Sequence, residues 1–157
     1  IVGYGVIEFK SNRFSVVDYG AITTNAGTPF ERRLELIYDD LNLLMGKFHP
    51  EAMSIEKLFY NTNAKTVIDV AQARGVTVLA AKKNNIPIFE YTPLQDKQSV
   101  VGYGRAEKKQ VQEMTRIILK LAKIPKPDDT ADALAMAICH AHASGSLMGK
   151  LNSMGIR

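Results

Sequence analysis

Three carboxylates in this 157-residue chain have the types and spacing of a divalent-cation site. Glu56 ends a short apolar segment, Ala52 to Ile55, that is typical of a buried strand, and sites collect at strand ends in open α/β sheets. Asp129 and Asp132 lie three residues apart at the start of an apolar helix, which puts both on one helical face. Carboxylate oxygens suit hard cations such as Mg²⁺ or Mn²⁺, which bridge phosphate oxygens. The three acids therefore predict metal-dependent chemistry on a phosphate ester.

Each acid also has a purely structural explanation. Asp129 stands where a helix N-cap is preferred, and such a cap stabilises a helix by about 1 kcal/mol. Capping explains Asp132 less well, because Asp132 lies one turn inside the helix, next to the apolar run Ala133 to Ile138. A carboxylate placed against such a helix needs compensation for its lost hydration. His140 and His142 do not share a helical face, so a site for a softer metal such as Zn²⁺ is not predicted.

Positive charge is concentrated in one segment of the chain. The whole sequence has 20 Lys and Arg against 16 Asp and Glu, a formal charge of +4. Residues 93–126 hold eight of these cations against three acids, a net +5, which leaves −1 for the other 123 residues. Basic residues neutralise phosphates without regard to base sequence, although a solvated helix face is the alternative explanation. The cations nearest the glycine hinge at Gly102 and Gly104 are Lys97, Arg105, Lys108 and Lys109.

These side chains need a sheet and helices to position them. Residues 1–9 and 14–22 read as two strands joined by a turn at Ser11-Asn12, which predicts an antiparallel hairpin. Helical periodicity follows over 30–48, then a strand at 52–56, a long helix over 63–83 interrupted at Gly75, and a strand at 86–91 near the sheet's edge. Helices are expected over 93–101, 106–121 and 129–143. This order predicts an α/β fold with a mixed sheet and helices on both faces. The residues expected to point inward from the long helix are Val67, Val70, Ala71, Val76, Val78 and Leu79.

The composition predicts one folded domain. A chain of this size buries about two thirds of its unfolded surface, so it needs no disulfide, and its one Cys closes no internal bridge. We expect the domain to span residues 1–143, with an incomplete opening strand, and residues 144–157 to form a mobile tail or part of an interface. No apolar run approaches the ~20 residues that cross a bilayer, so we expect no membrane association and a cytoplasmic location.

Several short motifs, taken in this order and spacing, resemble the RuvC family of Holliday junction resolvases over nearly the whole chain to about Ala143. The matching stretches are Gly3-Tyr4-Gly5-Val6-Ile7, Ile55-Glu56-Lys57-Leu58-Phe59, Gln72-Ala73-Arg74-Gly75, Lys97-Gln98-Ser99-Val100-Val101-Gly102, Ala106-Glu107-Lys108 and Asp129-Thr130-Ala131-Asp132-Ala133-Leu134-Ala135. The resemblance implies an RNase H-like fold, with a mixed five-stranded sheet flanked by helices.

The resemblance also implies an activity and partners. Members of the family act as homodimers that nick two strands of a four-way DNA junction symmetrically during recombination and repair, using Mg²⁺, with Mn²⁺ as an alternative ion. The branch-migration proteins RuvA and RuvB are the implied partners. Glu56, Asp129 and Asp132 match three of the four acidic positions of the family and are the expected catalytic residues and metal ligands. Lys97, Arg105, Lys108, Lys109 and the aromatic Phe59 are the expected DNA contacts; Phe59 would support bases displaced at the junction centre.

One expected acid is missing from the sequence. Family members carry Asp-Pro-Gly at the end of the opening strand, a few residues ahead of the motif that stands here at Gly3-Tyr4-Gly5. We expect that residues ahead of Ile1 were lost; the alternative is a junction-binding protein that does not cut. For the chain as given, the prediction is junction binding with severely reduced cleavage. A different RNase H-like nuclease, for instance one acting on RNA–DNA hybrids, is a further alternative.

Overall fold

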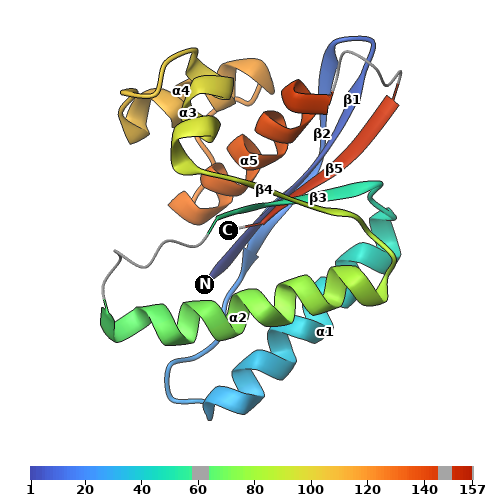
Figure 1. The fold of residues 1–157 in the computed structure, drawn as a ribbon, viewed down its shortest axis with the longest axis vertical. Helices are drawn as coiled ribbons and strands as arrows, with labels where there is room; N and C mark the ends of the chain where they lie inside the picture. The colour runs from blue at the N-terminus through green and yellow to red at the C-terminus, as the bar shows by residue number, and fades with distance from the viewer. Residues whose placement is uncertain (58–63, 145–149, 157) are drawn as a thin grey trace.

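The structure is a computed structural model that describes residues 1–57, 64–144 and 150–156 (Figure 1). In this part of the chain, five strands form one sheet in the order β2-β1-β5-β3-β4. β1 pairs antiparallel with β2 and β5, whereas β3 pairs parallel with β4 and β5. The mixed α/β fold that we expected is confirmed. The elements are β1 (Val2–Lys10), β2 (Arg13–Ile22), α1 (Phe30–Phe48), β3 (Ala52–Glu56), α2 (Ala64–Lys83), β4 (Ile88–Tyr91), α3 (Pro93–Val101), α4 (Lys108–Ile118), α5 (Asp128–Ser144) and β5 (Lys150–Ile156).

The β1–β2 hairpin turns where the sequence predicted. Ser11 and Asn12 have φ angles of 54° and 61°, and two successive residues with positive φ match the twist of the flanking strands. Side chains along β1 alternate between two cores because successive residues of a strand point to opposite faces. Val2 and Val6 belong to one core and Ile7 and Phe9 to the other. The hairpin therefore contributes to both layers of the molecule.

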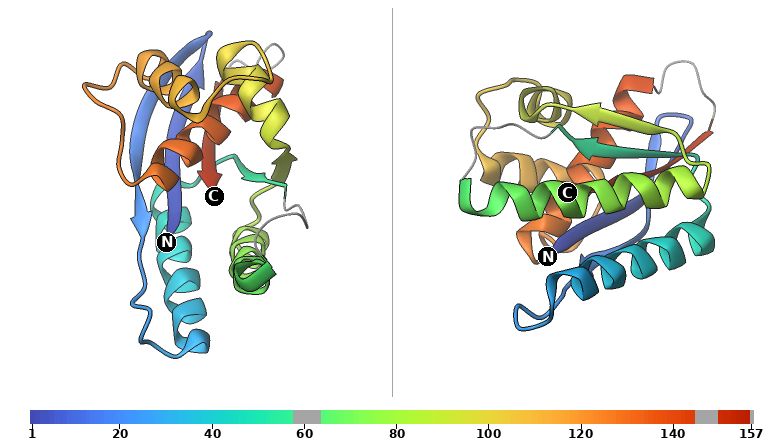
Figure 2. Two further views of the ribbon diagram at one scale, coloured as in Figure 1. Left: turned by 90° about the vertical axis from the view of Figure 1, so that its left-hand side faces the viewer. Right: turned by 60° about the horizontal axis from the view of Figure 1, so that its bottom comes forward.

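Helices cover both faces of the sheet, as Figure 2 shows. α1 and α2 pack on one face, where Ile37, Leu41 and Met45 of α1 are buried. α5 lies on the opposite face, and α3 and α4 pack against its outer side. Because α5 has the sheet on one side and helices on the other, the run from Ala133 to Ala141 is completely buried. The apolar helix of the sequence is thus the central helix of the second layer.

The long helix α2 differs from its prediction in two respects. It continues through Gly75 without a break, because a single glycine weakens a helix by only about 1 kcal/mol. The face that packs on the sheet carries Thr77, Ala80 and Ala81, whereas Val70 and Leu79, which we expected to point inward, are 50% and 52% exposed. Small side chains let the helix lie close to the sheet, and hydrophobicity alone does not reveal which of two apolar faces is covered.

Residues 150–156 form a strand, whereas we expected residues 144–157 to be a mobile tail or interface. β5 lies in the middle of the sheet, hydrogen-bonded to β1 on one side and to β3 on the other. Strand pairing is made by backbone groups that every residue except proline carries in full, so a segment poor in strand-forming side chains still forms a strand when both neighbours are available. The sheet thus extends beyond the boundary that we expected at residue 143.

No helix in the described residues is long and apolar enough to cross a membrane.

Candidate active site

The first turn of α5 is held against the β1–β2 hairpin. Gly3 and Gly5 lack side chains where the helix passes: a Cβ at Gly3 would overlap the backbone oxygen of Asp129, and one at Gly5 would overlap the side chain of Leu134. The Thr130 hydroxyl donates to the backbone oxygen of Gly20 over 3.0 Å. These close contacts fix the position of the turn that carries Asp129.

Glu56 lies at the same edge of the sheet as the first turn of α5. α5 runs along β1, from Gly3 beside Asp129 towards Gly5 beside Leu134, whereas β3 runs in the opposite direction. The Ser54 hydroxyl donates to the Met136 backbone oxygen over 2.9 Å, so this face of β3 contacts α5. Glu56 is two residues further along, on the same face, towards the acidic end of the helix. Figure 1 shows the end of β3 and the start of α5 at one edge.

The acidic turn of α5 is paired with basic residues. The Asp132 side chain is only 13% exposed, and its Oδ2 lies 3.4 Å from the Lys108 ammonium. The same ammonium lies 3.8 Å from Oδ2 of Asp128, which also pairs with Lys126 at 3.0 Å. The hydrogen bond from Lys126, with smaller contributions from the charges of Lys126 and Lys108, lowers the pKa of Asp128. Asp128 was missed by the sequence reasoning, although the Asp128-Asp129 doublet was its visible signal.

The carboxylate oxygens are ligands of the type that divalent cations prefer, but they do not supply a complete coordination shell for one. In the described part of the chain, no group of three or more His, Cys, Asp and Glu side chains lies close enough together to hold a metal ion. Hard cations such as Mg²⁺ prefer carboxylate oxygens, and they are commonly bound by one or two carboxylates completed by water and substrate phosphates. Glu56, Asp129 and Asp132, at one edge of the sheet, supply donors of that type. This arrangement suits a cation whose coordination is completed by a phosphate.

The expected DNA contacts lie on the layer outside α5. Lys97 is on α3 and is half-buried, whereas Arg105 is exposed in the connection between α3 and α4. Lys108 and Lys109 open α4, and both are exposed. Among residues 1–57, 64–144 and 150–156, Lys108 is the one of these four that pairs with an acid. Phe59 lies outside the described residues.

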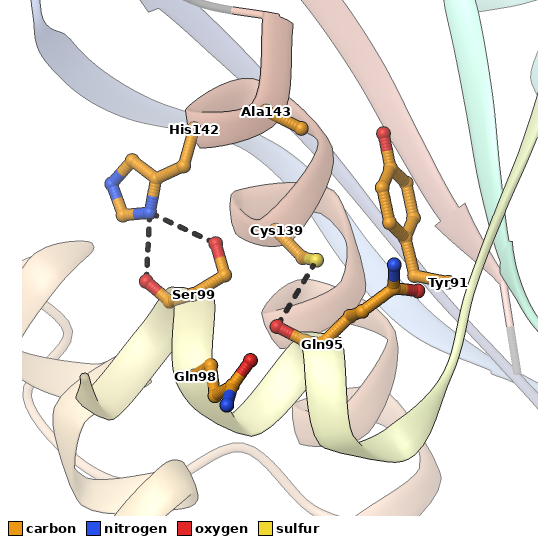
Figure 3. Close-up of a pocket in the computed structure, with 7 residues that line it drawn as sticks. All are labelled: Tyr91, Gln95, Gln98, Ser99, Cys139, His142 and Ala143. Carbon is orange, nitrogen blue, oxygen red and sulfur yellow. Dashed lines mark hydrogen bonds between the residues drawn. The ribbon is translucent and has the colours of Figure 1, made fainter. Parts of the chain in front are cut away.

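A pocket between α3 and α5 opens beside Tyr91 (Figure 3). Nδ1 of His142 lies 2.9 Å from the backbone oxygen of Ser99 and 3.2 Å from its hydroxyl. The Cys139 thiol donates to the backbone oxygen of Gln95 over 3.8 Å, and burial raises the pKa of that thiol to about 12. These polar groups of the pocket join the two helices.

The chain is similar to known proteins over nearly its whole length. The family model described as Crossover junction endodeoxyribonuclease RuvC matches residues 1–140. A relative of that description from Ruminiclostridium cellulolyticum is 60% identical, over 95% of this chain and 91% of its own. One from Clostridioides difficile is 55% identical over 99% of this chain and 91% of its own.

Solved structures agree with the sequence relatives. Thermus thermophilus RuvC in complex with Holliday junction substrate has a TM-score of 0.85 and 31% identity, over 90% of this chain and 87% of that one. Thermus thermophilus RuvC has a TM-score of 0.84 and 29% identity, over 96% of this chain and 92% of that one. The fold and these likenesses agree: the chain belongs to the RuvC family of crossover junction endodeoxyribonucleases.

Proposed function

We propose that this chain resolves four-way DNA junctions during recombination and repair in the cytoplasm, by nicking two strands symmetrically. The observation that carries the proposal is the ion pair that joins the acidic turn of α5 to the basic segment: Lys108 lies 3.4 Å from Asp132. A DNA phosphate approaching Lys108 thereby comes close to the acidic turn of α5. The likeness to a RuvC protein solved with Holliday junction substrate supports junction DNA as the substrate.

The chemistry we infer is hydrolysis assisted by Mg²⁺, or by Mn²⁺ in its place. Glu56 and Asp132 would be ligands, and Asp129 would be a third ligand or a nearby base. A cation held by these carboxylates would supply Lewis-acid chemistry, which favours ionisation of a water and charge on a leaving oxygen. The chain itself holds the substrate: Lys97, Arg105, Lys108 and Lys109 would neutralise phosphates beside the cut, and Phe59 would support displaced bases.

Symmetric nicking calls for two copies of the chain, and we place the dimer contact on α2. Ile68 and Leu79, 65% and 52% exposed, lie on one side of this helix with the exposed Gly75 between them. Their spacing of 11 residues is close to three helical turns, and the glycine adds no side chain that would keep a partner away. A two-fold contact through this face would set two active sites at a fixed distance.

The dimer is tested by measuring the molar mass in solution. Leu79→Glu puts a charge into the proposed contact and is expected to shift the protein from dimer to monomer in sedimentation equilibrium. Leu43→Glu on α1 is the matched control, because Leu43 is 71% exposed on a different helix. A Leu79→Glu protein that stays dimeric would remove α2 from the interface.

Family resemblance also leads us to propose cooperation with RuvA and RuvB. The test is whether junction cleavage in the presence of both proteins is faster than cleavage by the resolvase alone. An unchanged rate would count against this partnership.

One experiment separates the proposed activity from its alternatives. Binding to a synthetic four-way junction is measured in EDTA, and Mg²⁺ is then added and nicks are counted, with an RNA–DNA hybrid as competitor. We expect symmetric nicks in the junction, whereas preference for the hybrid would indicate another RNase H-like nuclease. Binding without any nick would indicate a junction-binding protein. Cleavage at the parent rate by Glu56→Gln and Asp132→Asn would refute the metal assignment.

A further inference from the structure

The strand end that carries Glu56 is attached to α5 through its neighbour Tyr91. Tyr91 is the register partner of Glu56 on β4, and the next backbone amide, that of Lys57, donates to the Tyr91 oxygen over 2.9 Å. The Tyr91 hydroxyl lies 2.7 Å from Nδ1 of His140, which is on α5. The residue beside Glu56 is therefore bonded to the helix that carries Asp132.

His140 is a firmly held partner for this bond. It is 2% exposed, and its ring stacks on Phe89 with the ring centroids 4.3 Å apart. Phe89 and Tyr91 are two residues apart on β4 and so point to the same face of the sheet. Phe89 thus packs against the face of the imidazole, while the Tyr91 hydroxyl bonds to Nδ1 at the edge of the ring.

The protonation of the pair favours a specific hydrogen bond. Burial lowers the pKa of His140, so its ring is neutral, and burial, with a smaller contribution from Cys139, raises the pKa of Tyr91, so its phenol keeps its proton. A protonated phenol donates to Nδ1 of a neutral imidazole, and this places the ring's own proton on Nε2. A neutral bond of this kind needs no counter-ion in the buried space between sheet and helix.

Two bonds between β3–β4 and α5 restrict the strand end more than one would. Ser54 is bonded to the backbone of Met136, and Tyr91 is bonded to the side chain of His140, one helical turn further along. A single bond leaves a pivot, whereas two bonds to successive turns fix both the distance and the angle between strand and helix. We propose that Tyr91, through its bond to His140, is a positioning residue that sets the separation of Glu56 and Asp132. This inference rests on the proposed metal-dependent function of those two acids.

The test is Tyr91→Phe, which removes only the hydroxyl. Small displacements of catalytic groups cost large factors in rate, so we expect single-turnover junction cleavage at saturating enzyme to fall by about tenfold. Junction affinity in EDTA is expected to stay within twofold, because Tyr91 is not one of the proposed phosphate contacts. The apparent affinity for Mn²⁺, measured by titration of the protein with the junction bound, is expected to fall by a similar factor to the rate. This last readout would not change if the hydroxyl served stability alone.

Tyr4→Phe is the matched control. Tyr4 is half-buried and its hydroxyl donates to Asp18 over 3.2 Å, but it belongs to the core on the opposite face of the sheet. We expect this variant to keep the parent cleavage rate and Mn²⁺ affinity. His140→Asn, which retains a polar group near the position of Nδ1, should lose less than His140→Leu.

The outcomes separate this inference from the proposed function. If Glu56→Gln abolishes cleavage while Tyr91→Phe retains the parent rate and Mn²⁺ affinity, Tyr91 is not a positioning residue and the proposed function stands. Equal losses in His140→Asn and His140→Leu, or equal losses of junction binding and cleavage in Tyr91→Phe, would also overturn the role proposed for the bond. If Glu56→Gln cuts at the parent rate, the metal assignment within the proposed function fails, whatever Tyr91→Phe does.

Discussion

The Lys108 ammonium lies 3.4 Å from Oδ2 of Asp132, so the basic segment and the acidic turn of α5 meet at an ion pair. Lys108 is 54% exposed, whereas the Asp132 side chain is 13% exposed. The lysine therefore presents its charge to solvent over a carboxylate that is largely covered. A phosphate at this position would compete with Asp132 for the lysine, while a divalent cation would compete with the lysine for Asp132.

Lys108→Gln is predicted to impair cleavage beyond its effect on DNA binding. Lys109→Gln is the matched control, because Lys109 is the adjacent exposed lysine of α4. Each substitution removes about one phosphate contact. The slope of log affinity for the junction against log salt concentration should therefore fall by about one. We expect Lys108→Gln to lower the single-turnover rate as well, because Lys108 forms an ion pair with Asp132 and no such pair of Lys109 is seen in the described part of the chain. Fluorescence anisotropy at several salt concentrations and quenched-flow cleavage measure the two effects. Identical rates for the two variants would contradict the prediction.

Gly3→Ala and Gly46→Ala are predicted to change stability in opposite directions. A Cβ at Gly3 would overlap the Asp129 backbone, so we expect a loss of about 1–3 kcal/mol in the free energy of unfolding and displacement of the acidic turn. A Cβ at Gly46 meets no atom within 4 Å, and Gly46 is exposed on α1, where alanine in place of glycine adds about 0.5–1 kcal/mol. Urea unfolding measures both changes. A Gly3→Ala protein as stable as the parent would mean that β1 and α5 are not in close contact.

The sequence was sufficient to predict those helices and strands whose formation depends on their own side chains. The β1–β2 hairpin follows from its turn residues, and α1 follows from a single apolar stripe. The position of Glu56 and the start of α5 at the same end of the strands was also predictable, because strand ends and helix starts meet there in an α/β sheet.

Features made by contacts between distant segments could not be predicted. The hydrogen bond between Tyr91 and His140 joins residues 49 positions apart, and the type of neither residue indicates which partner it will have. The covered face of α2 depends on which side meets the sheet, so Leu79 was assigned to the wrong side. β5 depends on backbone pairing with two neighbours, and backbone groups have no signature in a sequence.

The stability of the fold is predicted to fall as the pH drops below about 6.5, partly through His140. Burial lowers the pKa of His140 from its ordinary value of 6.5, so between the folded and unfolded pKa values the unfolded chain binds more protons. The contribution is complete above pH 6.5 and is lost as the pH falls through the folded pKa. Urea unfolding of the parent and of His140→Asn between pH 7.5 and 5.5 measures it. We expect a smaller loss in the variant, and equal losses would exclude His140 as a cause.

Cys139 is predicted to be unreactive in the folded protein. It is 2% exposed, and with a pKa of about 12 only roughly one thiol in 10⁴ is ionised at pH 8, while the thiolate is the reactive form. Ellman's reagent should therefore release no thionitrobenzoate from the native protein over several minutes and one equivalent after denaturation. Rapid release from native protein would show that α3 opens away from α5.

The shortness of β4 has a consequence for behaviour at high concentration. β4 lies at the edge of the sheet and has four residues, so it offers few backbone groups to a strand of another molecule. Glu90 forms an ion pair with Arg74 of α2 on one face, and Tyr91 is bonded to α5 on the other, so the strand is held from both sides. An edge that is short, charged and anchored in this way disfavours the intermolecular strand pairing from which β-aggregates grow.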